Sequence, residues 1–178
     1  MHGDGGMRTV LVTGGIASGK SEVCRYLAAK GWPVYDSDSR TKALYSSVPG
    51  LKARVEEAIG LPFGEIGIIF SDREKRDALE AVVYPQVIRD FRLWRESQGS
   101  GIAFLESAIA AEKPSLSCLY DSILLIRAEL GKRLERNPET ASRLAAQSPG
   151  DIRADYIIDN NGSIEELHAK IDEYIKTL

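Results

Sequence analysis

The stretch GGIASGKS, residues 14–21, decides the fold of this chain. It matches the G-x-x-x-x-G-K-[ST] pattern in full, in which backbone N–H groups of a glycine-rich turn bind phosphate oxygens. An apolar, β-branched run, TVLVT at residues 9–13, precedes it, and a segment of helical periodicity at 21–30 follows. A strand before and a helix after separate a true phosphate loop from a chance match. We therefore predict a nucleotide-binding site here.

The residues of this stretch have distinct expected roles. Lys20 is expected to reach the β- and γ-phosphates, and the hydroxyl of Ser21 to ligate Mg²⁺. The positive end of the following helix adds to the attraction for phosphate. The residues that we expect to contact ATP are Gly14, Gly15, Ile16, Ala17, Ser18, Gly19, Lys20, Ser21 and Glu22.

Strands and helices alternate along the rest of the chain. Further strands are expected at 33–36, 101–106, 122–126 and 154–160. Helices are expected at 38–60 with a break at SVPG, at 71–97 with Pro85 tolerated inside, and after Ser163, whereas 61–70 reads as irregular. Ser71 with Glu74, and Ser163 with Glu166, are expected to form the capping boxes of the last two helices. This alternation predicts an α/β fold of three layers, with a five-stranded parallel sheet flanked by helices on both faces.

Length and composition favour one soluble domain. The chain has 178 residues, of which 1–6 are expected to form a flexible tail and 7–178 a single domain. The formal net charge of −3 argues against broad electrostatic binding to nucleic acid or to a membrane. The two cysteines, Cys24 and Cys118, lack the spacing of a zinc site or a disulfide framework. No signal peptide and no apolar run of about 20 residues is visible, so a reducing cytoplasm is the expected location.

Carboxylates follow two of the expected strands. Asp36 and Asp38 come directly after the second strand, and strand ends in a parallel sheet face the ligand crevice. Asp38 could accept the proton of an acceptor hydroxyl, or both residues could only cap the next helix. Glu106 ends the third strand, where it could hold Mg²⁺ or orient the acceptor, or simply be a polar residue leaving the sheet.

A basic helix is expected at residues 127–137, with the sequence RAELGKRLERN. Arg133 and Arg136 are three residues apart and share a face. They could close over transferring phosphates, or they could belong to a solvated charged surface. An NKxD motif for reading guanine is absent from the sequence, so a GTPase is not expected.

Taken in order, these segments resemble the dephospho-coenzyme A kinase family. LVTGGIASGKS is similar to the family's LTGGIGSGKS, and VYDSDSR to its VIDADxxxR. ALEAVVYPQV at 78–87 is similar to LExxxHPxV, AAQ at 145–147 is shared, and ADYIIDNNGS at 154–163 is similar to ADxVIDNNGS. The matches follow the family's order over nearly the whole chain.

The resemblance implies ATP-dependent transfer of phosphate to the ribose 3′-hydroxyl of dephospho-coenzyme A, with Mg²⁺. It implies an acceptor-binding helical region at 40–97 and an arginine lid at 130–147. Asp38 takes the family's catalytic carboxylate, Lys20 and Ser21 the ATP and Mg²⁺ roles, and Arg133 and Arg136 the lid. The residues implied to lie near the adenine are Asn160, Asn161 and Gly162.

The sequence also departs from the family pattern. Tyr84 stands where the family has His, Glu22 where it has Thr, and Glu106 about where it has Asp. Glu112 is left as the match to a family Glu, Arg127 falls where the fourth strand often ends in Asp, and the lid is short. Two alternatives therefore stay open: a P-loop kinase for another nucleotide or small metabolite, and an ATP-binding protein with little kinase activity.

Overall fold

The computed structural model describes residues 6–99, 101–138 and 152–178, and the chain divides into two compact units. The core unit comprises Met1–Tyr35 and Gln98–Leu178. The helical unit comprises Asp36–Ser97 and is therefore one continuous insertion in the sequence of the core unit. Residues 1–5 of the predicted tail and residues 139–147 of the predicted lid, with Arg143 and the AAQ segment, lie outside the described residues.

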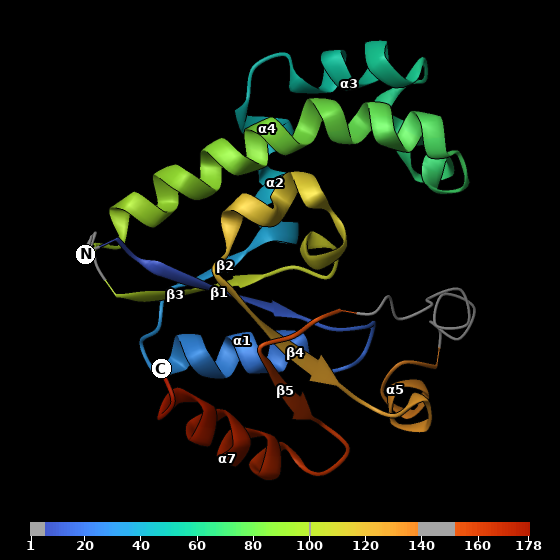
Figure 1. The fold of residues 1–178 in the computed structure, drawn as a ribbon. Coiled ribbons are helices and arrows are strands. Elements are labelled where there is room, and N and C mark those ends of the chain that lie inside the picture. Colours follow the sequence, from blue (N-terminus) through green and yellow to red (C-terminus); the bar gives the residue numbers. More distant parts are fainter. Residues whose placement is uncertain (1–5, 100, 139–151) are drawn as a thin grey trace. The chain divides into compact units, whose positions relative to one another are not determined.

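The core unit is built on a five-stranded sheet of order β2-β3-β1-β4-β5 (Figure 1). The strands are β1 Arg8–Thr13, β2 Val34–Asp36, β3 Ile102–Glu106, β4 Ser122–Arg127 and β5 Tyr156–Asp159. β1 pairs in parallel with β3 and β4, and β4 pairs in parallel with β5. The predicted α/β fold class is confirmed, and each strand lies within two residues of its predicted bounds.

The central strand β1 explains why the apolar run TVLVT forms sheet. Its side chains at Val10, Leu11 and Val12 are fully buried. Val10 stands opposite Phe104 of β3 and Ser122 of β4 in the register. A parallel strand covered on both faces needs apolar residues at consecutive positions, not only at alternate ones.

Helices cover the sheet on both sides. α1 (Lys20–Ala29) and α7 (Ile164–Ile175) lie on one side, and the 3₁₀ segments η2 (Ala110–Glu112) and η3 (Pro114–Leu119) lie on the other (Figure 1). α5 (Leu130–Arg136) follows β4. α7 begins at Ser163, whose side chain accepts the Glu166 N–H at 3.3 Å, as the predicted capping box requires.

The side of the sheet beneath α1 and α7 carries the main apolar cluster. Its buried members come from four strands and both helices: Val10, Val12, Val23, Cys24, Leu27, Phe104, Leu124, Ile126, Ile158, Leu167, Ile171 and Tyr174. Fully burying one such aliphatic side chain stabilises the fold by roughly 1.5–3 kcal/mol. This cluster therefore fixes α1, and with it the loop that precedes α1.

The helical unit contains α2 (Ser37–Ser47), α3 (Leu51–Ile59), η1 (Phe63–Ser71) and α4 (Arg73–Ser97). Its own buried cluster is made of Leu44, Leu51, Val55, Ile59, Ile69, Val83 and Val87. α4 continues through Pro85 for 25 residues, as the sequence predicted. An ion pair at 2.9 Å between Arg40 and Asp90 joins α2 to α4.

Two local predictions in this unit were wrong. The segment 61–70, expected to be irregular, holds the 3₁₀ helix η1. Ser71 was expected to cap α4, but Asp72 does so, because its carboxylate accepts the Lys75 N–H at 3.1 Å. η1 extends through Ser71, so the next residue supplies the cap.

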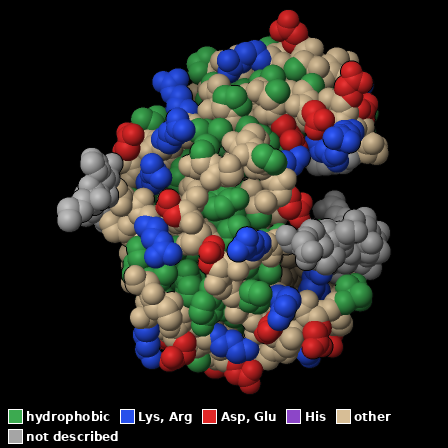
Figure 2. All heavy atoms as spheres, viewed as in Figure 1, with side chains coloured by type: hydrophobic (Ala, Val, Ile, Leu, Met, Phe, Trp, Pro, Cys, Tyr) green, Lys and Arg blue, Asp and Glu red, His purple; other side chains and the backbone are tan. Residues whose placement is uncertain are grey.

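Acidic and basic side chains are interspersed over the face of the molecule drawn in Figure 2. This mixture agrees with the small net charge of the chain. None of the described helices is long and apolar enough to span a membrane.

Candidate active site

The loop between β1 and α1 has three positions of positive φ: Gly14 at 151°, Ala17 at 59° and Gly19 at 108°. A Cβ on Gly14 would overlap the carbonyl oxygen of Ile126, and a Cβ on Gly19 would overlap Nδ2 of Asn160. The neighbouring strand ends thus approach the loop so closely that glycine is required at both positions. This is the conformation expected of a phosphate-binding loop.

Lys20 and Ser21 open α1 directly after the loop. Nζ of Lys20 donates to the carbonyl oxygen of Gly15 at 3.4 Å, so the ammonium group folds back over the loop. The hydroxyl of Ser21 donates to Oε1 of Glu106 at 2.7 Å. The structure therefore brings together the two residues predicted to hold Mg²⁺, which are 85 positions apart.

The Ser21–Glu106 pair suits Mg²⁺. A hydroxyl and a carboxylate offer hard oxygen ligands, and Mg²⁺ bound to a nucleotide takes few ligands from protein because it keeps waters and binds phosphates. Within residues 6–99, 101–138 and 152–178, no three His, Cys, Asp or Glu side chains gather into a fuller metal cage. The donor set fits an ion that takes its remaining ligands from phosphates and water.

Arg133 and Arg136 of α5 contact the outer rim of the loop. Nε of Arg133 donates to the carbonyl oxygen of Ile16 at 2.8 Å. Arg136 donates to the carbonyl oxygens of Ala17 and Ser18 at 3.3 and 3.4 Å. The two predicted lid arginines thus reach the ATP loop, but their described contacts are with its backbone.

Asn160 directly follows β5 and also binds the loop between β1 and α1. Its Nδ2 donates to the carbonyl oxygen of Ser18 at 2.8 Å. Its backbone carbonyl oxygen accepts from Arg136 at 2.7 Å. Its backbone N–H donates to the carbonyl of Arg127 at 2.7 Å. The side chain is buried. Asn160 is therefore part of the framework of the loop.

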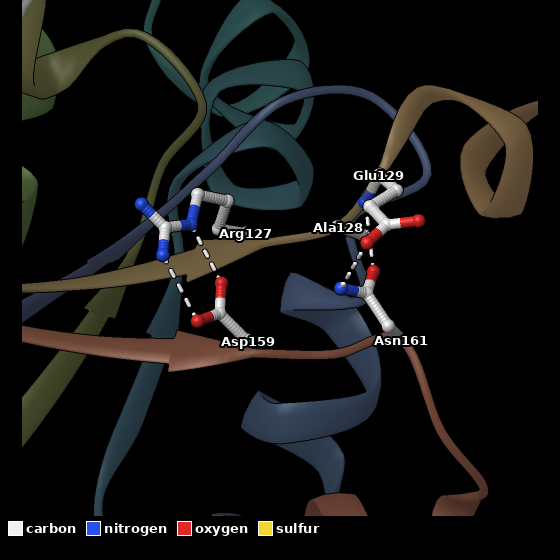
Figure 3. A pocket seen from close by; sticks show the side chains of 5 residues that line it. All are labelled: Arg127, Ala128, Glu129, Asp159 and Asn161. Atoms are coloured by element: carbon white, nitrogen blue, oxygen red, sulfur yellow. Dashed lines mark hydrogen bonds and ion pairs between the residues drawn. The ribbon is translucent and has the colours of Figure 1, made fainter.

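A pocket of about 360 Å³ lies beside this framework (Figure 3). It is lined by Arg127, Ala128, Glu129, Asp159 and Asn161, from the ends of β4 and β5. Asn161 accepts the Glu129 N–H at 2.8 Å and donates to its carboxylate at 3.4 Å. Gly162 follows Asn161 in the sequence and is exposed. A Cβ at this position would overlap the carboxylate of Glu166.

Arg127 and Asp159 face each other along one wall of the pocket, from β4 and β5 respectively (Figure 3). Nε and a terminal nitrogen of Arg127 donate to the two carboxylate oxygens at 2.6 and 2.9 Å. This hydrogen bonding lowers the pKa of Asp159 and raises the pKa of Arg127. The Arg127 that departs from the family pattern is thus matched by an acid on the neighbouring strand.

Glu22, in the first turn of α1, contacts α7. Oε1 lies 3.0 Å from Nε2 of His168 on α7, and Oε2 lies 2.8 Å from Arg25. His168 also stacks on the ring of Tyr26, with centroids 3.8 Å apart. Glu22 was predicted to contact ATP, and its described contacts instead join α1 to α7.

In the helical unit, Asp36 is the N-cap of α2 and accepts the N–H groups of Asp38 and Ser39, each at 3.1 Å. The capping role that the sequence left open therefore belongs to Asp36. Asp38 is exposed in the first turn of α2. The hydroxyl of Tyr84 on α4 is buried without a hydrogen-bond partner among the described residues; burial first, then nearby Glu80, raises its pKa.

The chain is similar to known proteins over nearly its whole length. No model of a protein family matches the chain. A curated dephospho-CoA kinase of Anaeromyxobacter dehalogenans is 31% identical, over 97% of this chain and 92% of that protein. One of Parasynechococcus marenigrum is 34% identical, over 92% of this chain and 93% of that protein. The chain belongs to the dephospho-CoA kinase family.

Solved structures agree with the fold. The crystal structure of TT1252 from Thermus thermophilus has a TM-score of 0.79 and 30% identity, over 97% of this chain and 98% of that one. Dephospho-CoA kinase from Campylobacter jejuni has a TM-score of 0.56 at 17% identity, over 96% and 94%, and shows the fold alone. The predicted resemblance, the P-loop kinase fold and the enzyme class, a kinase acting on an alcohol group, are confirmed.

Sequence reasoning missed two residues that line the pocket, Glu129 and Asp159, and the contact of Glu22 with His168. The motif DNNG contains Asp159, so its position before Asn160 was a usable signal. His168 carried none, because it sits 146 residues from Glu22 in a helix expected only to pack.

Proposed function

We propose that this member of the dephospho-CoA kinase family transfers the γ-phosphate of ATP to the ribose 3′-hydroxyl of dephospho-CoA. The observation that carries the proposal is the 2.7 Å contact of Ser21 with Glu106 at the mouth of a phosphate loop. Family membership supplies the acceptor, since the curated relatives are named for it.

In this proposal the loop holds the ATP phosphates. Backbone N–H groups of the loop bind phosphate oxygens, and Lys20 moves from its long contact with the Gly15 carbonyl to the β- and γ-phosphates. Ser21 and Glu106 would hold Mg²⁺, which supplies neutralising charge to the phosphates when bound. Arg133, from the rim of the same loop, adds positive charge over the site.

Asp38 is proposed to orient the acceptor. Its carboxylate is exposed in the first turn of α2 and takes no part in the cap, which leaves it available to a hydroxyl. The 3′-oxygen attacks the γ-phosphorus, the bond to the β–γ bridging oxygen breaks, and the hydroxyl proton goes to Asp38. ADP leaves with the electron pair of that bond.

The pocket beside Asn161 is proposed to receive the adenine. Asp159 and Asn161 border it on the β5 side, and Arg127, Ala128 and Glu129 on the β4 side. Its volume of about 360 Å³ is at the lower end of that of ordinary ligand sites. A cytoplasmic location is part of the same proposal, because Cys24 and Cys118 are both free thiols.

The test is turnover by the purified protein with ATP and Mg²⁺. Dephospho-CoA is offered beside a panel of nucleosides, nucleotides and small alcohols, and both ADP and the phosphorylated product are quantified by mass spectrometry. We expect coenzyme A as the main product. If the protein phosphorylated another hydroxyl and not dephospho-CoA, that other compound would be its acceptor. ATP binding in calorimetry without transfer to any acceptor would show a nucleotide-binding protein instead.

A further inference from the structure

The guanidinium group of Arg136 is occupied by the backbone of the ATP site. It donates to the carbonyl oxygens of Asn160, Ala17 and Ser18 at 2.7, 3.3 and 3.4 Å. A guanidinium carries five N–H donors in a fixed fork, so three carbonyl acceptors engage much of its capacity. An arginine that stabilised a transferring phosphoryl group would instead keep that fork for phosphate oxygens.

The loop that Arg136 contacts contains an unusual residue. Ala17 has a φ of 59°, and it is the only non-glycine residue with positive φ in the described part of the chain. Alanine disfavours this left-handed conformation because its Cβ approaches the following carbonyl oxygen. Such a conformation persists where surrounding contacts hold it. The carbonyl of Ala17 itself is one of the three that Arg136 binds.

Contacts of Arg133 and Asn160 support the same conformation of the loop. Arg133 binds the carbonyl of Ile16, so the three consecutive carbonyls of residues 16–18 all accept from α5. An outward-turned C=O directs the N–H of the same peptide toward the inside of the loop. There the Ser18 N–H donates to the carbonyl of Gly15 at 3.1 Å, and the N–H groups of Ala17 and Gly19 can face a bound anion. Nδ2 of Asn160 adds a second donor to Ser18, and Arg136 holds the backbone of Asn160 in turn.

We propose that Arg136 is a positioning residue for ATP, which holds Ala17 in its left-handed conformation and so maintains the phosphate-binding shape of the loop. This rests on the proposed function only for the identity of the nucleotide. It reassigns Arg136 from the direct lid role expected from sequence, and leaves Arg133 as the lid arginine of α5.

The experiment is a double-mutant cycle with Arg136→Ala, Ala17→Gly and the double variant, read out as ADP affinity by calorimetry. Loss of Arg136 lets Ala17 relax, so we expect ADP to bind about tenfold more weakly, the effect of one charged hydrogen bond. Glycine adopts positive φ at no steric cost, so Ala17→Gly is expected to restore most of this loss in the double variant. Alone, it should change the affinity by less than about twofold.

The matched control is Lys132→Ala, which removes a positive charge from the same helix. Lys132 pairs with Glu135 at 3.1 Å and is exposed, so ADP affinity should stay unchanged. Arg136→Gln gives a second reading should the alanine variant fold poorly. If Arg136 variants lowered kcat with ADP affinity intact, or if Ala17→Gly gave no rescue, Arg136 would act on the phosphoryl group and the proposal would fall. ADP binding needs no acceptor, so the outcome is independent of dephospho-CoA.

Discussion

Ser21 and Glu106 meet at 2.7 Å although one opens α1 and the other closes β3. The register explains the meeting, because Val12 near the end of β1 stands opposite Glu106. Strand ends of a parallel sheet share one edge, and the helix that follows β1 starts at that edge. A hydroxyl and a carboxylate are thus held together at the edge of the central sheet.

The first prediction concerns this pair. Glu106→Gln keeps a hydrogen-bond acceptor for Ser21 but removes the charge that attracts Mg²⁺. We expect the Mg²⁺ concentration for half-maximal activity to rise about tenfold or more, with thermal stability nearly unchanged. The measurement is an Mg²⁺ titration of activity at saturating substrates. Glu112→Gln, an exposed carboxylate of η2, is the control, and an equal shift in both variants would contradict a specific role for Glu106.

The second prediction separates ATP binding from chemistry. Asp38→Ala should lower turnover by about 10²–10⁴-fold, the usual range for a lost general base, and leave ADP affinity largely intact. Lys20→Ala should abolish turnover and weaken nucleotide binding as well. Turnover assays and calorimetry on each variant provide the two readings. Near-full activity of Asp38→Ala would remove Asp38 from the mechanism.

The third prediction concerns the Arg127–Asp159 pair and pH. Because Arg127 lowers the pKa of Asp159 in the folded state, the pair adds stability above the ordinary Asp pKa of about 3.9, and that stability is lost as pH falls through the lowered value. Asp159→Asn should therefore destabilise the protein at pH 7, and the difference should vanish in acid. Urea unfolding at several pH values measures it.

The effect should also shrink in high salt, since both side chains are about half exposed. A difference between the wild type and Asp159→Asn that grew toward low pH would contradict the assigned pairing.

The fourth prediction concerns Tyr84. Its buried hydroxyl lies near Glu80 and makes no well-aligned hydrogen bond among the described residues, so Tyr84→Phe should raise the free energy of unfolding by about 1 kcal/mol. Tyr45→Phe, in the same unit and also half-buried, is the comparison. Chemical denaturation measures both. A loss of stability in Tyr84→Phe alone would mean that the hydroxyl makes a stabilising contact.

The features that sequence predicted well are those with a short period or a fixed spacing. The five strands were predicted from apolar runs, and the phosphate loop from the spacing of Gly14 and Gly19. Glycine is required at both positions because a Cβ would overlap neighbouring atoms. Glu106 was predicted from its place at a strand end, and its meeting with Ser21 agrees with parallel topology.

The features that sequence could not predict depend on backbone conformation or on distant pairing. Arg136 binds the Ala17 carbonyl only because that peptide turns outward, and no residue type records such a turn. Glu22 meets His168 through the packing of two helices that are far apart in the chain. The cap at Asp72 differs from Ser71 by one position, within the usual uncertainty of helix boundaries.

The packing of α7 against α1 has a consequence during synthesis. Val23 and Leu27, near the start of the chain, are buried in one cluster with Leu167 and Ile171, near residue 178. The strands beside β1 are also made about a hundred residues after it, and such distant contacts form late. A ribosome-bound chain that lacks residues 164–175 therefore has the complete phosphate-loop sequence, but α1 lacks the apolar side chains of α7 that pack against it. Nucleotide binding should begin only after α7 has emerged.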